Sequence, residues 1–251
     1  MSDKKKVKYD LVVIGAGGTG SYFLKEISRL ISTDVSVKKQ LREMYIIDGD
    51  TVEEKNLSRQ AFLEEDIGRN KAIVMAEVLN TTYELSWRAV PSYITSNEQL
   101  ETLLPSYSNA HQGQYYLVPI IIGCVDNHAC RLLCEKLFEK SHSFIYFDSA
   151  NEFSTGECVF AYKINKRVLG PCRSHYFPNI TSGDLRNVTE ISCDELNLVA
   201  PQHIFTNMAA GLQLCSAFSN LMNGNLTPGF TLFNVHKYEM EFIPYRHSKE
   251  E

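Results

Sequence analysis

The feature that most constrains this fold is a glycine-rich turn between an apolar segment and a helical one. The apolar run Leu11–Ile14 is followed by Gly15, Gly17 and Gly20 in the spacing G-x-G-x-x-G, with Gly18 among them. Glycines permit a tight turn there, and the N–H groups that open the next helix face an anion favourably. The turn therefore predicts a βα unit with a nucleotide site, although a purely structural tight turn would use the same glycines.

Downstream, apolar runs bounded by turn residues alternate with segments of helical period, which is typical of βαβ units. This rhythm predicts an α/β fold: a Rossmann-like, mostly parallel sheet with flanking helices. The expected strands are 9–14, 44–48, 85–91, 118–125 and 143–148, and the expected helices are 19–30, 68–80 and 127–140. The polar segment 105–114 is expected to be a surface loop.

After residue 150 the character of the sequence changes. We expect a strand at 156–163, a long irregular crossover loop at 165–200, and a long helix at Ile204–Met222. Two antiparallel strands, 229–235 and 238–244, should close the fold as a hairpin. One helical face should carry Ile204, Phe205, Met208, Leu212, Cys215 and Leu221. That face could pack against the sheet or against a second copy of the chain.

Composition excludes several classes of protein. The chain has 251 residues, 44% hydrophobic and 22% charged, with a net charge of −5, which argues against nucleic acid as the main partner. No run is apolar enough for a membrane span or a signal peptide, so we expect a cytoplasmic protein. Seven cysteines at irregular spacings indicate reduced thiols. We expect Cys130, Cys134 and Cys215 to pack in the core.

A second motif, Asp48-Gly-Asp50-Thr-Val-Glu-Glu-Lys-Asn56-Leu-Ser-Arg59-Gln60, follows the second expected strand. An acidic residue at a strand end can bind ribose hydroxyls, and a positioned amide and guanidinium beyond it indicate chemistry at a phosphate. The motif therefore predicts that a nucleotide is turned over as well as bound.

Two further residues extend this candidate site. Lys71 lies in the first turn of its expected helix, where an unpaired ammonium opposes the helix dipole and would bind an anion; a solvent-facing lysine is the alternative. Asp126 and Asn127 follow the apolar strand 118–125 at the edge where open α/β sheets bind ligands. Asp126 could hold Mg²⁺ on ATP phosphates, or could cap the helix that follows.

These motifs resemble, in order and approximate spacing, the E1-like activating superfamily that includes the ThiF, MoeB and HesA proteins. The similarity runs from the glycine turn to Asp126-Asn127-x-x-x-Arg131, and continues at Asp148-x-x-Asn151. The C-terminal part, with Ser192-Cys193 and Asn207-x-x-Ala210, is most similar to compact bacterial ThiF-like proteins of the PRTRC type. A single adenylation domain is implied, with a nucleotide-binding part at 1–150 and the crossover loop, long helix and hairpin at 151–251.

The resemblance implies ATP-dependent adenylation of a carboxylate, usually the C-terminal glycine of a ubiquitin-like β-grasp protein, with release of pyrophosphate. By matching position, Asp48 and Asp50 would lie at the nucleotide, and Asp48 would bind the ribose. Asn56, Arg59 and Lys71 would hold phosphates, supported by Gln60, and Asp126 would coordinate Mg²⁺. The family also implies a homodimer.

This sequence departs from the family at three points. Only Cys172-x-x-His175 and Cys193 resemble the paired zinc motifs, even with His203 added, so we predict no structural zinc. Few residues precede the first strand, so we expect the arginine that relatives lend across a dimer to be absent. The protein would then be a slower catalyst, or Arg167 or Arg173 would take the place of that arginine. Cys193, or else Cys172, is the candidate for a thioester or persulfide.

Three other functions compete with this interpretation. An NAD(P)-dependent oxidoreductase would use the glycine turn and Asp48, but would leave Asn56, Arg59 and Lys71 without a role. A non-catalytic scaffold could keep the nucleotide site for stability. A member of the same superfamily could adenylate a small molecule, a peptide or a tRNA-borne carbonyl, and the acidic pI weighs against the tRNA.

Overall fold

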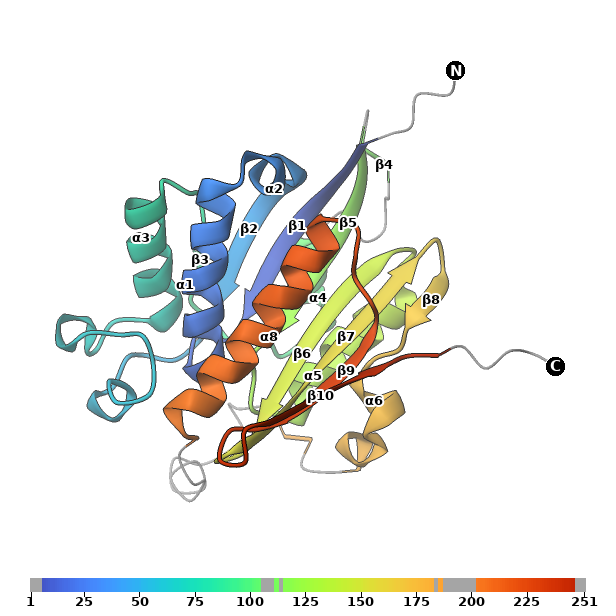
Figure 1. Ribbon diagram of the computed structural model, residues 1–251. Coiled ribbons are helices and arrows are strands. Elements are labelled where there is room, and N and C mark those ends of the chain that lie inside the picture. Colours follow the sequence, from blue (N-terminus) through green and yellow to red (C-terminus); the bar gives the residue numbers. More distant parts are fainter. Residues whose placement is uncertain (1–5, 105–110, 113–114, 183–184, 187–201, 247–251) are drawn as a thin grey trace.

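The computed structural model describes residues 6–104, 111–112, 115–182, 185–186 and 202–246. Its centre is a ten-stranded sheet in the order β10-β9-β7-β6-β5-β1-β2-β3, with β4 paired to β5 and β8 paired to β7 (Figure 1). The strands are β1 (Lys6–Ile14), β2 (Leu41–Ile47), β3 (Arg88–Val90), β4 (His111–Gln112), β5 (Tyr115–Gly123), β6 (Phe144–Asn151), β7 (Thr155–Ile164), β8 (Arg167–Gly170), β9 (Gly229–Asn234) and β10 (Glu239–Pro244).

The α-helices are α1 (Gly18–Thr33), α2 (Val35–Gln40), α3 (Lys71–Tyr83), α4 (Asn97–Leu103), α5 (His128–Lys140), α6 (Arg173–Tyr176) and α8 (Ile204–Met222). Short 3-10 helices are η1 (Glu54–Asn56), η2 (Glu64–Asp66) and η4 (Pro178–Thr181). Strands β3, β2, β1, β5 and β6 are mutually parallel, and β7, β9 and β10 continue the sheet antiparallel. The predicted fold class is confirmed, including the closing hairpin.

Helices cover both faces of this sheet. Helices α1, α3 and α8 lie on one face, and α4 and α5 lie behind the sheet in Figure 1. A hydrophobic core lies on each face, and alternate residues of β1 belong to different cores. Leu11 and Val13 pack on the face of α1, α3 and α8, and Val12 and Ile14 pack on the face of α4 and α5. Burial on both faces explains why the run is continuously apolar.

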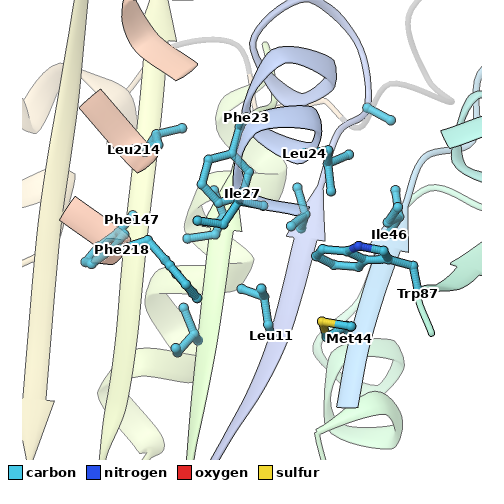
Figure 2. Close-up of a cluster of buried hydrophobic side chains, with 14 of the residues drawn as sticks. Leu11, Phe23, Leu24, Ile27, Met44, Ile46, Trp87, Phe147, Leu214 and Phe218 are labelled. Carbon is cyan, nitrogen blue, oxygen red and sulfur yellow. The ribbon is translucent and has the colours of Figure 1, made fainter. Parts of the chain in front are cut away.

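Close packing of α1 against α8 forms the centre of the larger core. Figure 2 shows Phe23, Leu24 and Ile27 of α1 with Leu214 and Phe218 of α8, on one face of the sheet. All five side chains are fully buried. Helix α1 is thereby held firmly at the end of β1, and the glycine turn lies where these two elements meet.

The expected apolar face of α8 does not pack against the sheet at Phe205, Met208 and Leu212. Phe205, Met208 and Leu212 are exposed, at 59%, 43% and 64%. The buried face instead carries small and polar residues among larger ones: Thr206, Asn207, Ala210, Gly211, Leu214, Ala217, Phe218, Leu221 and Met222. A Cβ on Gly211 would lie only 3.2 Å from the backbone N of Phe23. The two helices approach closely, and only small side chains fit between them.

Two predicted loops contain regular structure. Strand β4 lies inside the expected loop 105–114, and β8, α6 and η4 lie inside the expected irregular stretch 165–200. Helices α2 and α4 are also additional to the predicted ones. These elements are two to seven residues long, too short for a periodic pattern to reveal. Within the described ranges, no helix has the length and apolar character to cross a membrane.

Candidate functional site

The glycine turn directly follows the carboxyl end of β1. Gly15 has φ +93°, and a Cβ there would lie 2.4 Å from the carbonyl oxygen of Cys124. A Cβ on Gly20 would lie 1.8 Å from the carbonyl oxygen of Gly15. Side chains are therefore excluded at both positions. Among the described residues no side chain caps α1, and no acidic residue occupies its first turn, so its first N–H groups are left for a ligand.

Asp48 follows β2 and binds the glycine turn directly. Its Oδ2 accepts a hydrogen bond from Ala16 N at 2.6 Å, and its Oδ1 accepts one from Asp50 N at 2.8 Å. Burial, and then the nearby Asp50 carboxylate, raise the pKa of Asp48 from 3.8 to about 6, against the opposing effect of Lys71. A carboxylate next to a glycine turn is the arrangement that binds ribose hydroxyls.

The pKa of Asp48 predicts a pH-dependent stability. Because the folded-state pKa is raised, the stabilising contribution of Asp48 is present below pH 4 and is lost as pH rises through about 6. A shift from 3.8 to about 6 corresponds to about 3 kcal/mol. In Asp48→Asn, the free energy of unfolding should fall less between pH 5 and pH 7.5 than in the wild type. Urea unfolding at both pH values checks this, and equal falls in the two proteins would contradict it.

Lys71 is buried, at 5% exposure, in the first turn of α3. Its ammonium pairs with Asp50 Oδ2 at 2.9 Å, and the Tyr93 hydroxyl donates a hydrogen bond to Asp50 Oδ1. Burial alone would raise the pKa of Asp50, but the charge of Lys71 and the hydroxyl of Tyr93 lower it. The prediction that Lys71 is an unpaired cation is therefore wrong, as is the solvent-facing alternative.

Two residues that the sequence did not single out organise this cluster. Tyr93 packs against Gly49. Burial, then the hydrogen bond to Asp50 and the negative charges of Asp50, Asp48 and Asp126, raise the pKa of Tyr93 above its usual value. Asn70 caps α3 and donates hydrogen bonds to the carbonyl oxygens of Asp48 and Asp50. An asparagine directly before a predicted helix is a sequence signal for an N-cap, so Asn70 could have been found. Tyr93 belongs to no sequence motif.

The Asn56–Gln60 segment lies beside α1. Asn56 is buried, and its Oδ1 accepts a hydrogen bond from Glu53 N at 2.9 Å. The segment is tied to the helix because Ala61 N donates a hydrogen bond to Ser21 Oγ at 3.1 Å. Gln60 is 7% exposed, and its buried Oε1 has no hydrogen-bond partner among the described residues.

Gln60 and Arg59 both have side-chain groups left to bind a ligand. A Cβ placed on Gly17 would lie 3.7 Å from Gln60 Nε2, so the Gln60 amide borders the glycine turn. Arg59 is partly exposed and forms no ion pair with the described residues. The Gln60 amide at the glycine turn and the guanidinium of the preceding residue, Arg59, are therefore polar groups left for a ligand.

Asp126 is exposed just beyond β5, at the same edge of the sheet. It does not cap α5: Asn127 is the N-cap, and its Oδ1 accepts a hydrogen bond from Cys130 N at 2.8 Å. The capping alternative for Asp126 is therefore wrong, and Asn127 has a structural role. An exposed carboxylate near nucleotide phosphates has the chemistry to hold Mg²⁺, which usually takes one or two protein carboxylates.

No group of three or more His, Cys, Asp and Glu side chains within the described part of the chain is placed to hold a metal ion. Cys172 is buried and His175 is exposed. Cys193 lies outside the described residues. The absence of structural zinc stays a prediction.

Arg173 is not available to a nucleotide. It is 1% exposed and forms ion pairs with Asp148 and Glu157, and Asp148 also pairs with Arg131 at 3.2 Å. Arg131 further donates hydrogen bonds to the carbonyl oxygens of Val125 and Ser149. These side chains form a buried ion-pair network, so Arg173 is excluded as a substitute arginine. Arg167 is exposed on β8.

Cys172 does not have the environment of a nucleophile. It packs in the core with the β1 residues Val12 and Ile14, and burial, with smaller effects from nearby acidic groups, raises the pKa of its thiol well above the usual value. The prediction that Cys130 and Cys134 are core residues is confirmed, and Cys215 packs against the larger core. The proposed role of Cys193 stays a prediction.

Comparisons with known proteins show similarity to activating enzymes. The chain is 34% identical over 98 residues to the NEDD8-activating enzyme E1 catalytic subunit of Saccharomyces cerevisiae, covering 39% of this chain and 28% of that protein. It is 25% identical over 134 residues to ubiquitin-like modifier-activating enzyme 5 of Mus musculus, covering 53% of this chain and 31% of that protein. The matches span less than a third of either relative.

Solved structures share the fold. The structure of E. coli MccB with ATP covers 99% of this chain and 66% of MccB, with a TM-score of 0.63 and 17% identity. The structure of PaaA covers 94% of this chain and 64% of PaaA, with a TM-score of 0.62 and 14% identity. The sequence model of the ThiF family matches residues 3–251. A match over nearly the whole sequence, on a fold with the expected glycine turn, shows that this chain belongs to the ThiF family.

Proposed function

We propose that this protein is an ATP-dependent adenylyltransferase that activates a carboxylate. The observation that carries the proposal is the hydrogen bond from Ala61 N to Ser21 Oγ, which holds the Asn56–Gln60 segment against the first turn of α1. The side chains proposed to bind phosphate belong to this segment, and its Gln60 amide borders Gly17 of the glycine turn. A domain that only held a dinucleotide would need the turn and the acidic residue, but not the added segment.

Each side chain has a role in this proposal. Asp48 accepts hydrogen bonds from the ribose hydroxyls, and the N–H groups of α1 face the phosphates. Arg59 holds phosphate oxygens, as does Lys71 through the ammonium donors that its bond to Asp50 leaves open, and Asn56 and Gln60 position the phosphates. Asp126 would hold Mg²⁺, which, when bound, offsets the negative charge of the triphosphate.

The reaction requires positioning and electrostatic stabilisation. A substrate carboxylate oxygen attacks the α-phosphorus of ATP, so a carboxyl C–O–P bond forms as the bond from the α-phosphorus to the bridging oxygen breaks. Pyrophosphate leaves with that oxygen and its electron pair. Negative charge builds on the phosphate oxygens, and Arg59 and Lys71 stabilise it most strongly in the transition state.

We further propose that the carboxylate is the C-terminal glycine of a ubiquitin-like β-grasp protein. The names of the yeast and mouse relatives describe activation of such modifiers, and MccB has been crystallised with the peptide MccA. Residues 1–150 would bind the nucleotide within a single adenylation domain, residues 151–251 would contribute the crossover loop, long helix and hairpin, and the enzyme would act as a homodimer.

ATP–pyrophosphate exchange with Mg²⁺ tests this function. The wild type should catalyse exchange only when a β-grasp protein ending in glycine is present, and Asp126→Ala should abolish it. Glu26→Ala is the matched control, because it removes an exposed carboxylate from a surface ion pair on α1. Exchange that persists in Asp126→Ala would contradict the role of Asp126.

Two further outcomes would overturn the proposed function. Absence of exchange together with tight NAD(H) binding would identify a dinucleotide-dependent enzyme. Exchange that is supported by a small carboxylic acid, but by no protein carboxyl terminus, would overturn the assigned substrate.

A further inference from the structure

Three polar side chains from distant parts of the chain meet beside the glycine turn. Thr19 comes from α1, Asn151 from the end of β6 and Asn207 from α8. Asn151 Nδ2 donates a hydrogen bond to Thr19 Oγ1 at 2.6 Å and a longer one to Asn207 Oδ1 at 3.4 Å. Thr19 Oγ1 lies 3.5 Å from the same Asn207 oxygen. Asn207 and Thr19 are 0% and 6% exposed.

The Asn207 amide oxygen accepts a hydrogen bond from the NH₂ group of Asn151 in this cluster. With the Asn151 amide oriented as in the structure, where its own Oδ1 has no partner among the described residues, turning the Asn207 amide over would bring two NH₂ groups together. The amide nitrogen consequently points away from Asn151. Asn207 Nδ2 is buried and has no acceptor among the described residues. Burying an unsatisfied donor costs folding free energy, so a retained one indicates an acceptor that arrives with a ligand.

The orphaned nitrogen lies against the first residue of α1. A Cβ added to Gly18 would be 2.4 Å from Asn207 Nδ2, so the glycine leaves the space that the amide occupies. Helix α1 has 16 residues, no side-chain cap and no acidic residue in its first turn. Its free N–H groups and the positive end of its dipole face the same region as the orphaned donor. Asn207 Nδ2 and the first N–H groups of α1 are all donors, which favours an anionic acceptor beside them. Asn151 Oδ1, in the same cluster, is a buried acceptor without a partner among the described residues.

We propose that Asn207 is a nucleotide-binding residue whose Nδ2 donates a hydrogen bond to a phosphate oxygen at the glycine turn. The inference rests on the proposed function and adds a donor from the C-terminal half of the chain. Helix α8 thereby completes the nucleotide site, and Thr19 and Asn151 position the amide. The required ligand chemistry is an oxyanion, which the phosphates of ATP supply and the substrate carboxylate would also offer.

Calorimetric titration with MgATP and with adenosine tests the proposal. In Asn207→Ala, affinity for MgATP should fall about 10- to 100-fold, because a hydrogen bond to a charged group is lost. Affinity for adenosine should not change, since adenosine has no phosphate. Asn220→Ala is the matched control: it removes an exposed asparagine near the other end of α8 and should leave both affinities unchanged. Asn207→Asp, which keeps the side-chain size but replaces the donor by a carboxylate, should weaken MgATP binding further.

The outcomes separate this inference from the proposed function. Equal affinities of the wild type and Asn207→Ala for MgATP would overturn the role of Asn207 and leave the proposed function standing. Equal losses for MgATP and adenosine would indicate a structural role and would also overturn it. An unchanged MgATP affinity combined with a raised KM for the carboxylate substrate would assign the donor to the carboxylate instead. A wild type that does not bind MgATP would overturn the proposed function itself.

Discussion

Replacing Arg59 by alanine is expected to slow ATP–pyrophosphate exchange by about 100- to 1,000-fold. The guanidinium forms no ion pair with the described residues, so its charge is available to a phosphate. An interaction that strengthens as charge develops on the α-phosphate lowers the barrier more than it improves ATP binding. We therefore expect kcat to fall more than KM for ATP rises.

The same substitution should leave the fold almost unchanged. Arg59 is partly exposed, and its backbone N–H, which alanine retains, donates a hydrogen bond to the carbonyl oxygen of Asn56. The free energy of unfolding should change by about 0.5 kcal/mol or less. Arg29→Ala is the matched control, because it removes an exposed guanidinium that pairs only at the surface with Glu26. Arg59→Ala with wild-type exchange, or with a large loss of stability, would show that Arg59 has another role.

Asp148→Ala is expected to destabilise the protein by about 3 to 5 kcal/mol. The carboxylate is 1% exposed and pairs with two buried guanidinium groups, those of Arg131 and Arg173. Removing it leaves two cations close together in the interior, with Glu157 as the remaining carboxylate partner of Arg173. The loss is a large fraction of the 5–15 kcal/mol that is typical of folded domains.

Urea unfolding of Asp148→Ala and Asp148→Asn measures this effect. The asparagine keeps an acceptor for the guanidinium N–H groups and should cost less than the alanine. Glu26→Ala breaks an exposed ion pair and should cost about 1 kcal/mol or less, which calibrates the contribution of a surface pair. An Asp148→Ala protein as stable as the Glu26→Ala protein would contradict a structural role for the buried network.

Local patterns predicted much of the site because the motifs lie at strand ends. The glycine spacing after an apolar run placed the turn, and the order of strands placed Asp48 and Asp126 at one edge of the sheet. Helix α8 illustrates the opposite case. Its apolar residues predicted a stripe through Phe205 and Leu212, yet the buried face is built on Ala210 and Gly211 because α1 approaches closely.

The sequence by itself determined the βα rhythm, the glycine turn and the identity of the phosphate-binding candidates, because these depend on residues that are close along the chain. Only the tertiary structure decided which charged groups are engaged. It pairs Lys71 with Asp50, buries Arg173 against Asp148 and leaves Arg59 without an ion pair among the described residues. It also brings Asn207 next to Thr19 at the glycine turn, although the two residues are 188 positions apart in the sequence. Such pairings depend on distance and burial in three dimensions, which sequence spacing does not encode.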